Sequence, residues 1–219
     1  MPLKNEMVVA LDGPAASGKG TLARRIADHF NLALLDTGAL YRAVGWKVLQ
    51  SGGDPDNEND ALKAVQKLSD IDLSNPDLKT ESIGAAASKV ASKPSVRRSL
   101  VDFQRNFAHN PPADKNGTIL DGRDIGTVIC PEAKFKIFVT ADIETRAKRR
   151  FLEEFGSEGS PENYQNILND LMARDERDMN RTTSPLKQAA NAHLIDTTEK
   201  DIEAVFDAAV AYVSSKQLE

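Results

Sequence analysis

The sequence predicts one α/β domain of three layers, in which helices cover both faces of a central parallel sheet. Short runs of β-branched and aliphatic residues alternate with stretches whose apolar residues repeat at helical spacing. The first such run, MVVAL (7–11), leads through a glycine-rich loop into the first helical stretch. The chain of 219 residues is long enough for one substantial domain with small insertions.

The first part of the chain alternates strand and helix twice. MVVAL is an uninterrupted apolar run bounded by Asp-Gly, as expected of a buried parallel strand. The apolar residues of TLARRIADHF are spaced for one face of a helix, which predicts a helix over 20–30. A second strand is expected to end at Leu35, and a second helix to span 38–50. SGGDPDNEND (51–60) is polar and rich in turn residues, so we predict a loop there.

The rest of the chain adds an insertion, three strands and three helices. The segment 60–109 is largely helical in pattern, broken at SNP (74–76) and at Pro94, and shows no clear strand. Two further core strands are predicted in TILDG (118–122) and KFKIFVT (134–140), and a last one in HLIDT (193–197). The charged region 142–181 predicts two helices joined by a glycine-bearing segment, and 199–216 predicts the last helix.

Composition excludes several classes of function. The net charge of -5 and the pI of about 5.4 argue against a broad nucleic-acid-binding surface. No apolar stretch approaches the about 18 residues of a membrane span, so we expect a cytoplasmic protein with no membrane or nucleic-acid partner. The single cysteine, Cys130, rules out an intramolecular disulfide and a four-thiolate zinc site. His29, His109 and His193 are scattered, and we expect no ligand cluster from them.

The string DGPAASGKGT (12–21) departs from the usual phosphate-binding pattern G-x-x-x-x-G-K-[ST], because Gly20 follows Lys19 and the hydroxyl comes one place later at Thr21. Glycines between a strand and a helix let backbone N–H groups and a helix N-terminus face an anion, and Lys19 adds a point charge. The alternative is an ordinary glycine-rich turn with a solvated lysine, which the flanking strand and helix disfavour. Gly20 has no hydroxyl to ligate Mg²⁺, so we expect no direct metal ligand and a metal held by phosphates and water.

Five more strings follow in order: LLDTGALYR (34–42), SKPSVRR (92–98), LDGRDIGT (120–127), RAKRR (146–150) and ARDERDMNR (173–181). Together with the glycine loop they resemble the bacterial cytidylate kinases over nearly the whole chain. The resemblance implies a P-loop kinase fold with a mobile lid, and transfer of the γ-phosphoryl group of ATP to CMP or dCMP. It also implies Mg²⁺ as cofactor and a monomeric enzyme.

The resemblance implies three parts within a single domain over 1–219. The core is expected at about 6–59, 110–150 and 170–219, the nucleotide-monophosphate-binding lobe at about 60–109 and the lid at about 146–170. Many family members carry a small β-rich insert in the lobe. Residues 69–83 are too few to form those strands, so we expect a reduced lobe here.

The resemblance also assigns site residues. The catalytic groups are Lys19, Arg123 and Arg181, which act through their charge, and no general base is assigned. The expected ATP-binding set is Gly13, Pro14, Ala15, Ala16, Ser17, Gly18, Lys19, Gly20, Thr21, Arg149 and Arg150. The expected acceptor-binding set is Thr37, Tyr41, Arg42, Ser88, Arg97, Asp121, Arg123, Asp124, Arg174, Asp178 and Arg181.

Within the acceptor set, the matches imply distinct roles. Arg42, Arg123 and Arg181 match positions that hold the acceptor phosphate, and bidentate guanidinium groups suit that task. Ser88, Arg97 and Asp124 match positions that read the cytosine edge. A carboxylate accepts a hydrogen bond from the cytosine amine but repels the carbonyl of uracil. Arg174 and Asp178 match positions at the sugar, Tyr41 is expected to pack in the site, and Asp121 is expected to be an outer-sphere partner of Mg²⁺.

Several alternatives stay open at the level of sequence. The arginines of RAKRR form a solvated helix face with Glu153 and Glu154 in one interpretation, and Arg174 and Asp178 form a surface pair in another. A kinase for adenylate, thymidylate or shikimate is the first rival, and UMP is a candidate weak acceptor. A nucleotide-dependent switch or ATPase is the second rival, but such proteins usually keep a hydroxyl directly after the lysine.

Overall fold

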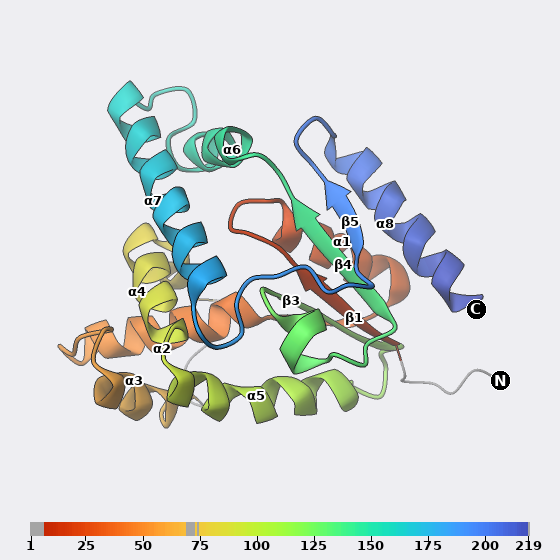
Figure 1. The fold of residues 1–219 in the computed structure, drawn as a ribbon, viewed down its shortest axis with the longest axis horizontal. Helices are drawn as coiled ribbons and strands as arrows, with labels where there is room; N and C mark the ends of the chain where they lie inside the picture. The colour runs from red at the N-terminus through yellow and green to blue at the C-terminus, as the bar shows by residue number, and fades with distance from the viewer. Residues whose placement is uncertain (1–6, 69–72, 74, 219) are drawn as a thin grey trace.

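The computed structural model describes residues 7–68, 73 and 75–218, and it contains one five-stranded sheet in the order β2-β3-β1-β4-β5. Every neighbouring pair of strands is parallel, which confirms the predicted sheet (Figure 1). The strands are β1 Met7–Asp12, β2 Ala33–Asp36, β3 Gly117–Gly122, β4 Phe135–Thr140 and β5 His193–Asp196.

Alternation along β1 divides the core into two halves, because successive side chains of a strand point to opposite faces. Val9 and Leu11 pack against α1 Lys19–Phe30 and α8 Ile202–Gln217 on one face. On the other face, Val8 and Ala10 pack in the cluster formed by α2 Thr37–Gln50 and α5 Pro94–His109. The molecule therefore has the three predicted layers.

The predicted helical insertion is present. It contains α3 Glu58–Val65, the 3-10 turn η2 Pro76–Lys79 and α4 Glu81–Ala91, before α5 begins. No strand occurs among the described residues of 60–109, as expected; residues 69–72 and 74, on which part of the reduced-lobe prediction falls, lie outside the described residues. The predicted loop 51–60 was wrong in its last three residues, because the side chain of Asn57 accepts from the N–H groups of residues 59 and 60 and starts α3 early.

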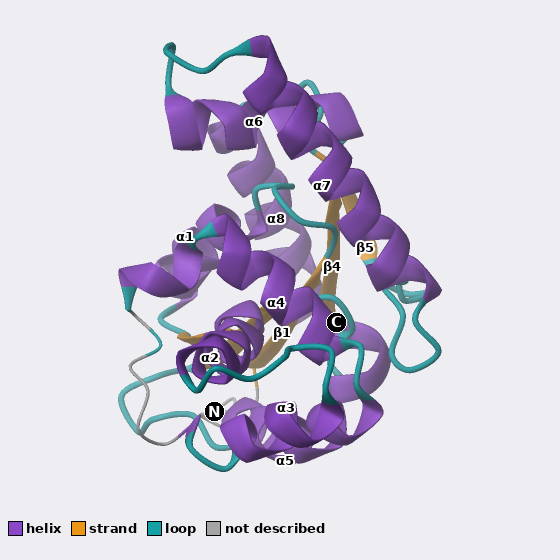
Figure 2. Ribbon diagram, turned by 90° about the vertical axis from the view of Figure 1, so that its left-hand side faces the viewer, coloured by secondary structure: helices purple, strands orange, loops and turns teal. Residues whose placement is uncertain are grey.

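Two long helices follow β4 and rise above the carboxyl ends of the strands (Figure 2). They are α6 Ile143–Phe155 and α7 Pro161–Asn180. Gly156 ends α6 with a φ of 58°, and Ser160 with Asn163 forms a capping box that begins α7, with Pro161 in its first turn. These local signals explain why the glycine-bearing segment separates two helices as predicted.

Two further features complete the description. A short π-helix, η3 Ile125–Ile129, follows β3 and was not predicted. Among residues 7–68, 73 and 75–218, no helix combines the length and the apolar character that crossing a membrane requires.

Candidate active site

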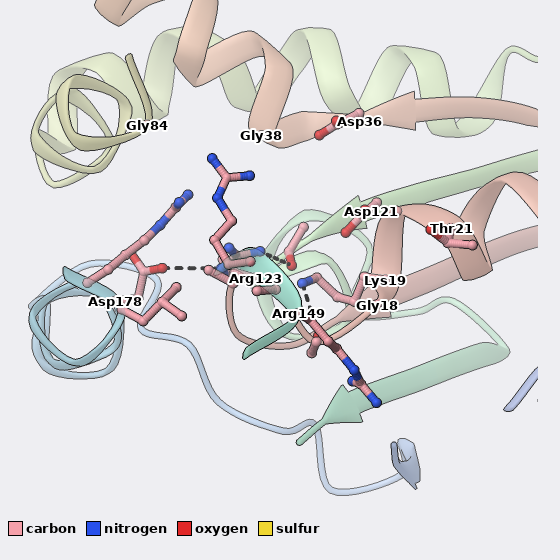
Figure 3. A pocket seen from close by; sticks show the side chains of 18 of the residues that line it. Gly18, Lys19, Thr21, Asp36, Gly38, Gly84, Asp121, Arg123, Arg149 and Asp178 are labelled. Carbon is pink, nitrogen blue, oxygen red and sulfur yellow. Dashed lines mark hydrogen bonds and ion pairs between the residues drawn. The ribbon is translucent and has the colours of Figure 1, made fainter. Parts of the chain in front are cut away.

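A cavity of about 1090 Å³ lies at the carboxyl ends of β2 and β3, between the glycine loop, α2, α4 and α7 (Figure 3). In parallel α/β sheets this edge is where ligands bind, because loops and helix N-termini converge there. The cavity joins segments that are far apart in sequence, from Ala15 in the glycine loop to Val205 in α8.

The glycine loop has a backbone that only glycine allows at two points. Gly13 has a φ of 149°, and a Cβ there would lie 1.9 Å from the carbonyl oxygen of Val139. Gly18 has a φ of 89° and forms the N-cap of α1, so the helix begins at Lys19 with its N-terminus facing the cavity. Free N–H groups at a helix N-terminus make this end of the cavity an anion-binding environment.

Lys19 is buried at the centre of this loop. Its ammonium donates to the carbonyl oxygen of Pro14 at 2.6 Å and to Ser17 Oγ at 3.4 Å. Burial, followed by repulsion from Arg123, lowers the pKa of Lys19 to about 7, although Asp121 and Asp12 act in the opposite direction. A lysine held near its titration point is ready to gain a proton when a phosphate arrives.

Several arginines also line the cavity near Lys19. Burial first, then repulsion from Arg123, lowers the pKa of Arg174 to about 10, and its Nε has no hydrogen-bond partner. Burial also lowers the pKa of Arg42, which lines the same cavity. Guanidinium groups crowded in this way are stabilised by a polyanion, because it relieves their mutual repulsion.

Two buried aspartates hold this arginine cluster in place. Arg123 Nε donates to Asp178 Oδ2 at 3.2 Å, the contact drawn as a dashed line in Figure 3. Burial opposes ionisation of Asp178, but Arg123, Arg174 and Arg181 outweigh it and keep the pKa of Asp178 below its usual value. The surface-pair interpretation of Arg174 and Asp178 is therefore wrong, because the carboxylate is buried and pairs with Arg123 and Arg181.

Asp124 is the second of these aspartates. It forms a buried ion pair with Arg97, whose exposed fraction is 3%, and its Oδ1 lies 3.7 Å from Arg181. The guanidinium carbon of Arg97 lies 5.4 Å from the centre of the Tyr41 ring, and Tyr41 Oη has no hydrogen-bond partner. Ser88 is buried on α4 and lines the same cavity.

Three carboxyl and hydroxyl groups gather where β2 and β3 end. Asp36 and Asp121 are partners in the strand register, and both side chains lie by the cavity (Figure 3). Burial raises the pKa of Asp121, while Lys19 opposes the shift. Thr37 Oγ1 donates to the carbonyl oxygen of Asp121 at 2.7 Å, which joins the start of α2 to the end of β3.

The three arginines of α6 have different surroundings. Arg146 is buried, pairs with Asp175 at 2.6 Å and donates to the carbonyl oxygen of Ala15 at 3.2 Å, so its solvated-face interpretation is wrong. Arg149 lines the cavity and donates to Thr197 Oγ1 at 2.8 Å. Arg150 also lines the cavity, but it pairs with Glu153 and Glu154 as the surface interpretation expected.

All the expected site residues line the cavity except Gly13 and Pro14, which belong to the glycine loop. Sequence reasoning missed Asp36, Arg177 and Thr197, which line the cavity as well. Arg177 Nε donates to Ser88 Oγ at 3.2 Å, and Thr197 Oγ1 donates to the carbonyl oxygen of Ser17 at 3.2 Å. Asp36 could have been predicted from the sequence, because it lies between an expected strand and an expected helix.

Comparison with known proteins decides the family. The family model described as cytidylate kinase matches residues 9–215. The chain belongs to the cytidylate kinase family. A cytidylate kinase of Mesorhizobium japonicum is 54% identical over 205 residues, which cover 94% of this chain and 93% of the relative. A cytidylate kinase of Bartonella bacilliformis is 52% identical over 210 residues and 95% of each chain.

A solved structure of an uncharacterized protein from Eubacterium ventriosum shares the fold of this family member. It has a TM-score of 0.56 and 16% identity, and the match covers 96% of this chain and 99% of the other. The likeness supports the three-layer α/β architecture alone.

One group outside the cavity contains a histidine. We expected no ligand cluster from the histidines; His109 lies with Cys130 and Glu132, and the ligand atoms of these three residues are within 4.8 Å of one another. His109 Nε2 lies 3.3 Å from Glu132 Oε1, and both side chains are exposed. Burial raises the pKa of the Cys130 thiol to about 12, which disfavours the thiolate that a metal needs. We therefore assign this group no role.

Proposed function

We propose that this member of the cytidylate kinase family transfers the γ-phosphoryl group of ATP to CMP or dCMP, and releases ADP with CDP or dCDP. The observation that carries the proposal is one cavity that contains both a phosphate loop with Lys19 and, near Lys19, a cluster of arginines. Two polyanions meet in such a reaction, so positioning and charge stabilisation dominate catalysis.

The donor nucleotide is assigned to the glycine loop. The N–H groups of the loop and the N-terminus of α1 would bind the β- and γ-phosphates, and Lys19 would neutralise the transferring group. The bond between the γ-phosphorus and the β-phosphate oxygen breaks as a bond to an acceptor phosphate oxygen forms. That oxygen is already a nucleophile near neutral pH, so no protein base is required.

The acceptor nucleotide is assigned to the arginine cluster. Arg42, Arg123 and Arg181 would bind its phosphate, and Lys19, Arg123 and Arg181 would stabilise charge in the transition state. Arg174 and Asp178 would bind the sugar. Asp124 would accept from the amine of cytosine, while Arg97 fixes its carboxylate and Ser88 lies near the same base edge.

Mg²⁺ fits the carboxylates at the ends of β2 and β3. Asp36 and Asp121 offer hard oxygen ligands beside Lys19, and a cation there would offset the burial that raises the pKa of Asp121. We propose that both act through water molecules bound to Mg²⁺, in the outer-sphere role that the resemblance implies for Asp121. Bound Mg²⁺ would supply charge neutralisation between the phosphates.

The parts of the domain follow the same proposal. The core covers about 6–59, 110–150 and 170–219, and the acceptor lobe about 60–109. The segment 146–170 is proposed as a lid that closes Arg149 and Arg150 over the phosphates and excludes water, the competing acceptor. We also propose a monomer in the cytoplasm.

The test compares the wild-type protein with Asp124→Asn and Asp124→Ala, using CMP and UMP as acceptors. Hydrogen bonds to charged groups are worth about 1.5–3 kcal/mol, so kcat/KM for CMP is expected to fall about 10- to 150-fold in either variant. Asp124→Asn should shift preference toward UMP, because its amide N–H donates to a uracil carbonyl.

Glu176→Ala, an exposed change on α7 outside the cavity, is the matched control and should keep wild-type kinetics. A wild-type protein inactive with CMP would overturn the proposed function. An unchanged preference for CMP over UMP in both Asp124 variants would overturn the assignment of the cytosine site.

A further inference from the structure

Asp12 is a buried carboxylate that the proposed reaction does not use. It is the last residue of β1, its exposed fraction is 4%, and it does not line the cavity. A carboxylate removed from water is costly unless hydrogen bonds compensate it. Its burial therefore requires hydrogen-bond donors nearby.

Both oxygens of Asp12 accept hydrogen bonds from one turn. Ile125 N–H donates to Oδ1 and Gly126 N–H donates to Oδ2, each at 2.8 Å. These N–H groups begin the π-helix η3, whose own hydrogen bonds start at Val128 N–H donating to the carbonyl oxygen of Asp124. Asp12 thus satisfies backbone donors that the short helix leaves without an internal partner.

The turn that Asp12 holds carries two of the acceptor-site side chains. Arg123 and Asp124 lie directly before Ile125, and both line the cavity. The fit around the turn is close: a Cβ at Gly126 would lie 3.3 Å from Asp12 Oδ2 and 3.2 Å from Lys136 Cδ. Because Asp12 is paired with Gly122 in the strand register, the clamp fixes this turn to the rigid centre of the sheet.

Burial and hydrogen bonding act in opposite directions on the ionisation of Asp12. Burial raises the pKa of Asp12 to about 7, and the N–H groups of Gly126 and Ile125 act against this shift. Asp124 raises the pKa further, while Lys19 lowers it. The side chain thus lies between the phosphate loop, which begins at the next residue, and the acceptor turn.

We propose that Asp12 is a positioning residue for the acceptor: its carboxylate clamps the 125–126 backbone and thereby fixes Arg123 and Asp124 toward the nucleotide. This inference rests on the proposed function and deepens it, because it assigns acceptor affinity and base selectivity to a residue that touches neither substrate. ATP binding depends on the loop after Gly13 and should be much less affected.

The test is the kinetics of Asp12→Asn. An amide oxygen can accept from one of the two N–H groups, but its NH₂ group then faces the other, so the turn must move. The KM for CMP is expected to rise about tenfold while the KM for ATP changes less than about twofold. The preference for CMP over UMP should fall as well.

Gly126→Ala is a second variant, which retains Asp12. Its added methyl group would crowd Asp12 Oδ2 and so displace the same turn. It replaces Asp12→Asn in the test if that variant does not fold. It should produce the same shift in the KM for CMP. Val213→Ala, a buried change in α8 outside the cavity, is the control for lost stability alone. It should lower the active fraction equally for every acceptor and leave KM values and base preference unchanged.

The outcomes separate this inference from the function on which it rests. Wild-type protein without activity on CMP would overturn the proposed function. Wild-type activity on CMP, with an unchanged KM for CMP in both Asp12→Asn and Gly126→Ala, would overturn the positioning role alone. A rise in the KM for CMP matched by an equal rise for ATP would also overturn it.

Discussion

At the scale of single residues, the cavity is lined by an excess of positive charge, although the protein as a whole is acidic. The net charge of the chain is -5, yet Lys19 and a group of arginines face the same interior space. Asp124 and Asp178 pair with some of these arginines, but Arg174 Nε has no hydrogen-bond partner. The arrangement is stabilised when phosphates supply the missing anions.

Lys19 should take up a proton when ATP binds. Its pKa is lowered to about 7 by burial and Arg123, and nearby phosphate charge favours the ammonium form and raises that pKa. At and just above neutral pH, binding is therefore expected to consume a fraction of one proton. Calorimetry of ATP binding in buffers of different ionisation enthalpy measures this uptake.

Two variants test whether Lys19 is the group that titrates. Lys19→Met and Lys19→Arg should both lose the uptake, because methionine has no proton to gain and arginine does not release one at this pH. Lys19→Met should also lower kcat by about 100- to 1,000-fold, as expected when a charge aimed at the transition state is removed. Equal proton uptake in the wild type and Lys19→Arg would contradict the assignment.

Much of the cavity could be predicted from sequence because its residues occur in short strings with a known arrangement. Arg177 and Thr197 were missed because their roles depend on contacts with Ser88 and Ser17, far away along the chain. The burial of Arg146 could not be predicted either, because the sequence of a basic helix face is the same whether its arginines are solvated or pair with a distant residue such as Asp175.

At the scale of elements, α6 joins the phosphate loop to α7. Arg146 is fixed to the loop through Ala15 and to α7 through Asp175. Ala147, one residue on, packs with Ile167 and Leu171 of α7. One helix thus presents a fixed arginine to the core and Arg149 to the cavity.

Arg149→Gln should weaken the closure over ATP. We expect the KM for ATP to rise about tenfold, with little change in the KM for CMP, because Arg149 lies on the side of Thr197 and the phosphate loop. The ratio of ATP hydrolysis to transfer should also rise, since water gains access to the phosphates. Measuring free phosphate and CDP in one reaction gives this ratio.

Lys148→Gln is the matched control, an exposed neighbour on the same helix that does not line this cavity. It should keep the wild-type KM for ATP, the wild-type KM for CMP and the wild-type ratio of ATP hydrolysis to transfer. Equal kinetics in the two variants would argue against a role of Arg149 in closure.

Regular elements were predictable because their hydrophobic periodicity is local. The strand around Val9 is apolar on both faces, the strand around Ile137 is apolar on the face that packs in the core, and α1 repeats its apolar residues on one side. The π-helix at Ile125 was not predictable, because its first N–H groups bond to Asp12, more than a hundred residues earlier. Hydrogen bonds between residues far apart in the chain produce no periodic pattern in the sequence.

At the scale of the whole molecule, a parallel sheet brings distant segments to one edge. The glycine loop follows β1, the Thr37 helix follows β2 and the Arg123 turn follows β3, so two binding regions meet at neighbouring strand ends. α7 covers this edge and contributes Arg174 and Asp178 (Figure 2). The fold therefore brings the proposed donor-binding and acceptor-binding groups to one cavity.

The most direct test of this account is the stoichiometry of products. Protein, ATP and Mg²⁺ are incubated with CMP, dCMP, UMP, AMP, dTMP or shikimate, and ADP and phosphorylated acceptor are quantified together over time. The account predicts equal amounts of ADP and CDP or dCDP, slow turnover of the other acceptors, and little ADP without acceptor. ADP forming at the same rate with and without CMP would contradict it and indicate an ATP hydrolase.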